Sequence, residues 1–275
     1  MEYTLTEATL LFNDSFKRWT YGDNWSTTPE IEKYNLHKLR HSIGVLEIWR
    51  LILLGKEFQN ISNELKRKSE ICFLLHDLWR FYQNDWENTL NNEEFEHGDE
   101  SAKIVAKQGY WKEIILAIKY HNKRDFNKLY DENDFINMNK EEQKETIFLT
   151  RILRDADKLQ NLLYIIFAFD SLYKLDYNNY KWKGITTEIL NEFLALKAVD
   201  NRKRKTKADY LLSMVARWFD LEFISTYNIL IQNDFFNFIL EKLETEFWID
   251  QFTIMQIEES INKIVDLIRN KNNLK

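Results

Sequence analysis

Apolar residues recur at helical spacing along most of the chain. In the segment "HKLRHSIGVLEIWRLILL", His41, Val45, Ile48 and Ile52 fall on one face of a helix. The same pattern predicts helices at about 69–82, 98–108, 111–122, 140–174, 186–198, 206–231, 233–246 and 248–270. Asn139, with Glu142 three residues later, has the form of a capping box at the start of the helix at 140. The sequence therefore predicts an all-α protein.

Composition agrees with long helices and narrows the class of protein. Among 275 residues, Pro occurs once and Gly six times, so few residues favour the tight turns that short strands need. The net charge of −6 gives no support to nucleic-acid binding. Cys72 is the single cysteine, which excludes an intramolecular disulfide and fits a reducing compartment. The opening "MEYTLTEATLLFND" lacks the pattern of a signal peptide, and no apolar run is long enough to span a bilayer, so we expect a soluble, cytoplasmic protein without a membrane partner.

The histidines are placed where a helical protein buries its side chains. His41 and His121 each continue an apolar helix face, and His97 stands at a predicted helix start. His76 is followed directly by Asp77 inside the apolar run "CFLLHDLWRF". Burying several imidazoles and a carboxylate is costly unless they share a cation. Such mixed nitrogen and oxygen ligands favour divalent Fe, Mn, Co, Ni or Zn over Ca²⁺ or Mg²⁺.

The order of these residues along the chain resembles the HD-domain metal-dependent phosphohydrolases. The resemblance rests on "LRHSIGVLEI" with His41, "LLHDLWRF" with His76 and Asp77, "EHGDESAKIV" with His97, "AIKYHNK" with His121, and "LRDADKLQNLL" with Asp157. It implies an HD-domain helical bundle at about 31–170, with additional C-terminal helices at about 171–275 packed on it. No Pro/Gly-rich linker separates the two parts, so we expect residues 1–275 to form a single all-α unit.

The resemblance also implies a set of ligands for each of two metal ions. His41, His76, Asp77 and Asp157 match the ligands of the first metal in this family. His97 and His121 match the extra histidines of members that hold a second metal, with Asp77 as the bridge between the two ions.

Asp155 competes with Asp157 for the last ligand position. The two are about 200° apart around a helix, so they cannot both face one site. The family's ligand is the aspartate of an Ala-Asp pair, which matches Asp157. Arg151 and Lys158 flank Asp155 at helical spacing, which predicts a solvated ion-pair face for that residue.

The sequence departs from the family's commoner His-Asp-Ile-Gly-Lys form. Arg80 takes the place of the lysine and is predicted to bind the substrate phosphate, with Asp77 as the other catalytic residue. Trp79 replaces the glycine and would shape the pocket. The basic run "NRKRKTKAD" at 201–209 is either a solvated loop or a basic flap in which Arg204 and Lys207 contact substrate phosphates.

Together these features indicate a hydrolase that cleaves a phosphomonoester or phosphodiester of a small phosphorylated substrate, a nucleotide in our prediction. A water activated between two metals would carry out the attack. Two other readings stay open: an HD-fold di-iron oxygenase, and a non-catalytic metal-binding regulatory protein. Arg80 and the basic run favour an anionic substrate over oxygen chemistry, and the complete ligand set argues against a silent site.

Overall fold

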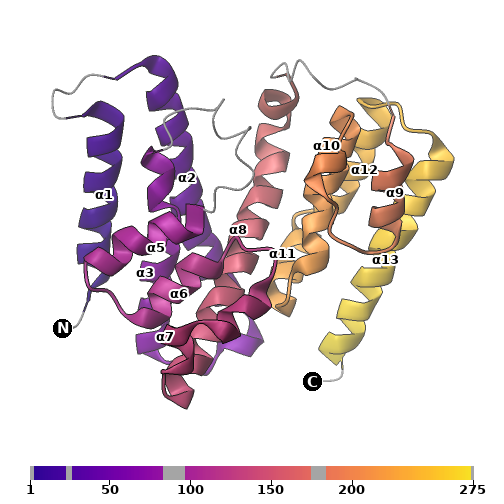
Figure 1. The fold of residues 1–275 in the computed structure, drawn as a ribbon. Coiled ribbons are helices and arrows are strands. Elements are labelled where there is room, and N and C mark those ends of the chain that lie inside the picture. Colours follow the sequence, from indigo (N-terminus) through magenta and orange to yellow (C-terminus); the bar gives the residue numbers. More distant parts are fainter. Residues whose placement is uncertain (1–2, 23–26, 83–96, 175–183, 274–275) are drawn as a thin grey trace. The chain divides into compact units, whose positions relative to one another are not determined.

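The computed structural model describes residues 3–22, 27–82, 97–174 and 184–273. Across these ranges the backbone forms helices joined by loops, with no β-strand (Figure 1). The all-α prediction is therefore confirmed.

The chain divides into two compact units. Met1–Leu54 and Phe58–Asp157 make up the first unit, and Gly55–Glu57 with Lys158–Lys275 make up the second. The packing of residues 171–275 onto the core as one unit stays a prediction.

The first unit is built around α3, which contacts α1, α2 and α6, while α5 packs against α6 and η2 (Figure 1). Its elements are α1 (Leu5–Tyr21), α2 (Pro29–Ile52), α3 (Asn63–Leu75), η2 (Leu78–Tyr82), α5 (His97–Lys107), α6 (Lys112–Tyr120), η3 (Phe126–Asp131), α7 (Asn133–Ile136) and the first half of α8 (Lys140–Lys174).

The helices begin where polar side chains satisfy the first backbone N–H groups. Thr28 caps α2, whose first residue is Pro29, and Ser62 caps α3. At α8 the Asn139 side chain accepts hydrogen bonds from the first-turn amides, and the Glu142 carboxylate accepts one from the Asn139 backbone N–H at 2.8 Å. The predicted capping box at the start of α8 is thus confirmed.

The predicted helix at 69–82 is wrong in one respect that matters for the site. Regular α-helix ends at Leu75, His76 and Asp77 form a turn, and the chain continues as the 3-10 helix η2. The break leaves amides without α-helical partners, and the Trp79 N–H donates instead to the Ser101 hydroxyl of α5 at 3.1 Å. Apolar periodicity carries no information about a partner 22 residues away, so it predicted one continuous helix across the break.

The second unit contains the remaining helices, with α13 against α9, α11 and α12, and α10 against α9. The predicted helix at 206–231 is wrong, because the backbone at Leu221 is extended and separates two helical parts. Leu221 is buried, and its carbonyl accepts a hydrogen bond from the Tyr227 hydroxyl at 2.5 Å, so tertiary contacts replace the helix there. The elements are α9 (Thr187–Leu194), η4 (Asn201–Lys203), α10 (Lys207–Val215), η5 (Ala216–Asp220), α11 (Ile224–Gln232), α12 (Phe235–Thr245) and α13 (Gln251–Asn273), with η1 (Lys56–Phe58) at the unit boundary.

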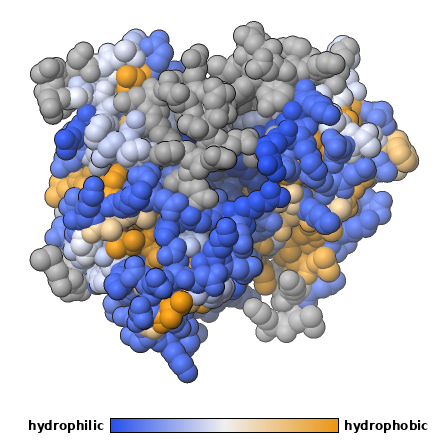
Figure 2. Space-filling model, viewed as in Figure 1, coloured by the Kyte–Doolittle hydropathy of each residue, from blue (hydrophilic) through white to orange (hydrophobic). Residues whose placement is uncertain are grey.

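The surface is mainly hydrophilic on the face that Figure 2 presents, with small apolar patches between the charged residues. Apolar surface of this scattered kind is normal in folded proteins. Within the described part of the chain, no helix is both long enough and apolar enough to cross a membrane.

A buried ion cluster ties three helices of the first unit together. Lys68 on α3 is 5% exposed, and its ammonium lies 2.8 Å from Glu113 on α6 and 2.6 Å from Glu145 on α8. Glu113 is 6% exposed. A buried charge that loses its partner destabilises a fold strongly, because its desolvation is no longer offset.

Replacing Lys68 with Met should therefore lower the free energy of unfolding by about 3–5 kcal/mol, as measured by urea denaturation. The control is Lys144→Met on α8, whose exposed pair with Glu141 should contribute under about 0.5 kcal/mol. Adding Glu113→Gln to Lys68→Met should restore part of the loss. Equal effects of Lys68→Met and Lys144→Met would contradict a stabilising role for the cluster.

Candidate metal centre

Two helices of the first unit bring His41 and Asp157 into contact although 116 residues of sequence separate them. His41 lies in the middle of α2 and is 8% exposed. Its Nε2 atom is 3.0 Å from Asp157 Oδ1 and 3.7 Å from Asp77 Oδ2. The predicted convergence of α2, α8 and the His76–Asp77 turn is thus present in the fold.

His76 and His121 occupy the same position at two different helix ends. Each is the C-cap residue of its helix, α3 for His76 and α6 for His121. The ring Nδ1 of His76 is 2.7 Å from the carbonyl oxygen of Phe73, and that of His121 is 2.6 Å from the carbonyl oxygen of Ile118. A carbonyl can only accept, so Nδ1–H donates in both rings and Nε2 keeps its lone pair. The helix ends therefore present two imidazoles in the tautomer that binds metals.

Asp77 lies between two pairs of histidines and offers one carboxylate oxygen to each pair. Oδ2 is 3.7 Å from His41 Nε2 and 3.8 Å from His76 Nε2. Oδ1 is 3.3 Å from His97 Nε2 and 3.7 Å from His121 Nε2. This arrangement suits a carboxylate that bridges two cations.

The donor atoms fit divalent transition metal ions. His76 and Asp77 are 0% and 4% exposed, yet His76 Nε2 and Asp77 Oδ1 have no hydrogen-bond partner among the described residues. His97 Nε2 and His121 Nε2 face each other at 3.2 Å. Buried polar atoms left this way are costly without a shared cation. Ligand atoms within 4.8 Å of one another form two groups, His41–His76–Asp77 and Asp77–His97–His121, while Asp157 joins the cluster through His41.

The electrostatics keep these residues in their ligating forms. Burial lowers the pKa of His76 to about 4 and that of His97 well below its usual value, so both rings are neutral at pH 7. Burial alone would raise the pKa of Asp77, but His76, His97 and Arg80 hold it well below the usual value. Burial likewise opposes ionisation of Asp157, but its contact with His41 together with the nearby His76 and His121 outweighs burial, so the pKa of Asp157 is lowered too. Neutral imidazoles and ionised carboxylates are the states that metals require.

Asp155 does not lie on a solvated face, and that part of the prediction is wrong. Asp155 is 0% exposed, whereas the Asp157 side chain is 24% exposed and contacts His41. Around this turn of α8, buried positions such as Ile152 and Leu153 lie on more than one side of the helix. The prediction for Asp155 was wrong because it assumed that one side of this helix faces solvent. Lys158, proposed as a partner of Asp155, donates to the Asp220 carbonyl at 3.1 Å.

Arg80 lies beside the Asp77 carboxylate, a second cation accompanies it, and the binding of substrate phosphate by Arg80 stays a prediction. Arg80 Nε is 3.9 Å from Asp77 Oδ2. Lys38 on α2 was missed by sequence reasoning, although it precedes His41 by three residues and so falls on the same side of the helix. Burial and the nearby Arg80 charge lower the pKa of Lys38 to about 8, while Asp77 and Asp157 act in the opposite direction.

The basic run at 201–209 makes its described contacts inside the second unit. Arg204 Nε donates to the Ser213 hydroxyl at 2.5 Å, and its guanidinium lies 4.7 Å from the centre of the Tyr210 ring. Lys207 is 2% exposed. A role for Arg204 and Lys207 in holding substrate stays a prediction.

Two further residues near the site are held by packing. Cys72, four residues before His76 on α3, is fully buried. Trp79 stacks on Tyr82 with ring centres 4.6 Å apart, and Tyr82 stacks on Trp19 at 3.6 Å. The Trp79 side chain, which stands in place of the family's glycine, is therefore part of an aromatic stack with residues of η2 and α1.

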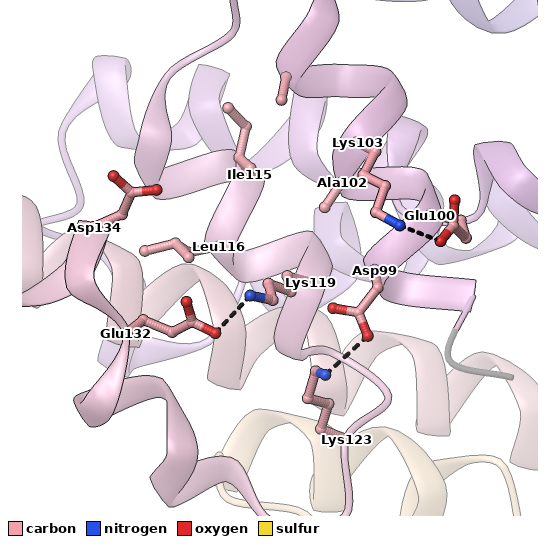
Figure 3. A pocket seen from close by; sticks show the side chains of 11 residues that line it. Asp99, Glu100, Ala102, Lys103, Ile115, Leu116, Lys119, Lys123, Glu132 and Asp134 are labelled. Atoms are coloured by element: carbon pink, nitrogen blue, oxygen red, sulfur yellow. Dashed lines mark hydrogen bonds and ion pairs between the residues drawn. The ribbon is translucent and has the colours of Figure 1, made fainter. Parts of the chain in front are cut away.

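A separate cavity of about 660 Å³ opens beside α5, α6 and the segment of η3 and α7 (Figure 3). Lys103, Lys119 and Lys123 in its wall are each paired with a carboxylate. A phosphate entering this cavity would have to displace an acidic partner from a lysine.

Comparison with known families agrees with this geometry. A model of the HD domain matches residues 39–162, the segment that contains all six predicted ligands. Residues 39–162 are therefore similar to the HD domain, a family made up mostly of metal-dependent phosphohydrolases. No curated protein and no solved structure matches the chain.

Arg154 is a further residue that sequence reasoning missed. It lies on α8 one turn before Asp157, and its Nη1 donates to the carbonyls of Tyr120, His121 and Lys123 at 3.2, 3.0 and 2.7 Å. They belong to the last residue of α6, to its cap residue His121 and to the loop that follows, where intrahelical donors run out. Arg154 thereby joins the helix of Asp157 to the helix end that carries His121.

Replacing Arg154 with Met should lower the free energy of unfolding by about 1.5–3 kcal/mol, because three carbonyls lose a charged donor. Urea denaturation measures this loss, and Arg154→Lys should recover part of it. Arg50→Met is the control, since Arg50 pairs with Glu47 and Glu70 but its side chain is 45% exposed, so these pairs should contribute under about 1 kcal/mol. An Arg154→Met protein as stable as Arg50→Met would contradict the joining role.

Proposed function

We propose that this protein is a metal-dependent phosphohydrolase that cleaves a phosphomonoester or phosphodiester of a small molecule, with nucleotides as the first substrates to test. The observation that carries the proposal is Asp77, which offers one oxygen to each of two histidine pairs with Arg80 alongside. Metals bound there would supply an activated water and neutralise charge on the phosphoryl group.

Each protein residue has a distinct part in this proposal. His41, His76, Asp77 and Asp157 would hold one metal, and His97 and His121 would hold a second that shares Asp77. The carboxylates provide negative charge, and the backbone carbonyls that accept from His76 and His121 keep the rings in place.

Arg80 and Lys38 would hold the phosphate of the substrate. The planar guanidinium of Arg80 can donate two parallel hydrogen bonds to phosphate oxygens. Lys38 acts as a point charge, and its depressed pKa reflects the neighbouring Arg80 cation and burial. Two cations held close together repel each other, so an anion between them relieves that repulsion.

His76→Ala and Asp77→Ala should each abolish metal-dependent phosphate release while leaving the helical content unchanged. Each variant loses a ligand, whereas the apolar core of α3 stays intact. Metal analysis of the purified chain, followed by a nucleotide and phosphoester panel with Mn²⁺ or Fe²⁺, measures both effects. If the metal-loaded chain released no phosphate yet consumed oxygen with a cosubstrate, the oxygenase reading would replace this proposal.

The Michaelis constant should depend on the charge of Lys38. Lysine is positively charged below its pKa, so substrate binding should be strongest below about pH 8 and weaken as the pH rises through that value. Lys38→Met should raise KM at pH 7 roughly 10- to 100-fold, the range expected for a charge-assisted hydrogen bond, and flatten the rise of KM above pH 8. Lys33→Met, on the exposed side of the same helix, is the control. An unchanged KM profile in Lys38→Met would exclude contact with the substrate.

A further inference from the structure

Two tripeptides of the first unit lie side by side in register. Residues 97–99 begin α5, and residues 121–123 follow the last turn of α6. The pairs along them are His97 Nε2 to His121 Nε2 at 3.2 Å, His97 Nδ1 to the Asn122 amide nitrogen at 3.1 Å, and Asp99 Oδ2 to Lys123 Nζ at 2.9 Å, the last visible in Figure 3.

Gly98 permits this close approach. A Cβ atom at Gly98 would lie 2.6 Å from Asn122 Oδ1, 2.8 Å from the Ile118 carbonyl oxygen and 2.9 Å from the Lys119 carbonyl oxygen. Such distances are too short for any side chain, so the missing Cβ sets how near α5 comes to the end of α6. The Asn122 amide fills the space that this leaves.

His97 differs from His76 and His121 in how its ring is held. The latter two donate Nδ1–H to a backbone carbonyl of their own helix. His97 is the first residue of α5 in the described part of the chain. The described partner of its Nδ1 is the side chain of Asn122.

We propose that Asn122 is a positioning residue whose amide oxygen accepts Nδ1–H of His97 and so directs Nε2 of His97 toward a second metal. The inference rests on the proposed function, because it names Asn122 as the residue that determines whether the second metal position is occupied. An amide has an acceptor end and a donor end of nearly equal size, and either can face His97. With the NH₂ end toward Nδ1, the ring proton would sit on Nε2 and block metal binding.

The surroundings of the amide favour the oxygen toward His97. The opposite end of the amide shares a small space with the Ile118 and Lys119 carbonyl oxygens. Oδ1 on that side is buried without a hydrogen-bond partner among the described residues. An NH₂ group there would face acceptors, while the oxygen would take the His97 proton. Both ends of the amide are then satisfied in the orientation that frees Nε2.

The test compares two substitutions at Asn122 in the full chain. Asn122→Asp keeps an acceptor of the same length, and Asn122→Leu keeps the volume but has no acceptor. After loading with Mn²⁺ and removal of the excess, metal content gives the number of ions, and electron paramagnetic resonance distinguishes a coupled manganese pair from an isolated ion. We expect two coupled ions in the wild-type and Asn122→Asp chains. In Asn122→Leu we expect one isolated ion and a second-site affinity reduced by about 10- to 100-fold.

Lys123→Met provides the matched control, because it removes the neighbouring pair with Asp99 but leaves the contact to His97. It should keep both ions; equal loss in Lys123→Met and Asn122→Leu would mean general loosening and overturn the positioning role. Two coupled ions in Asn122→Leu, or loss of the second ion in Asn122→Asp, would also overturn it. A wild-type chain that holds one ion overturns this inference alone, whereas a wild-type chain that holds none removes the proposed function as well.

Discussion

The burial of the Asp77 carboxylate is the constraint on which the site depends. Asp77 is 4% exposed and lies in a run whose neighbours Leu74, Leu75 and Leu78 belong to the core. A carboxylate in such surroundings must be paired or must bind a cation, because desolvation otherwise drives it to its neutral form. Four imidazoles and a guanidinium surround it within 4 Å, and they come from α2, α5, η2, the turn after α3 and the end of α6. The first unit thus brings several elements together around one negative charge.

Helix ends, more than helix faces, give the site its geometry. His76 and His121 follow the last turns of α3 and α6, and His97 opens α5. A residue at a helix end is close to backbone groups that the helix leaves without partners, and the histidine rings use these groups to fix their orientation. Asp77 lies in the turn between α3 and η2, and so it too stands outside a regular helix. Such positions combine the rigidity of a helix with side-chain directions that a regular helix surface does not offer.

The sequence predicted correctly those elements that nearby residues determine, and it failed where residues distant in the sequence determine the structure. The bounds of α8 followed from apolar periodicity and the Asn139–Glu142 cap. The order of the His and Asp residues pointed to the side chains that lie together around Asp77. The break after Leu75 depends on Ser101 of α5, so local pattern could not locate it. The burial of Asp155 likewise depends on what covers α8 on more than one side. Lys38 could have been found from its spacing to His41, but Arg154 could not, because its partners are backbone carbonyls that any sequence would supply.

Two polar anchors fix how far α6 can slide along α8, and this sets where His121 can lie relative to Asp157. The first anchor is Lys68, which joins Glu113 near the start of α6 to Glu145 on α8. The second is Arg154, which holds the carbonyls at the end of α6. The anchors are nine residues apart on α8, or about 13 Å at the helical rise, and eight residues separate Glu113 from His121 on α6. Apolar contacts between helices tolerate small shifts, whereas charged hydrogen bonds weaken quickly with distance and angle. A metal-ligand set needs its atoms placed to within a fraction of an ångström, and these directional contacts at both ends of α6 provide that precision where hydrophobic packing alone would not.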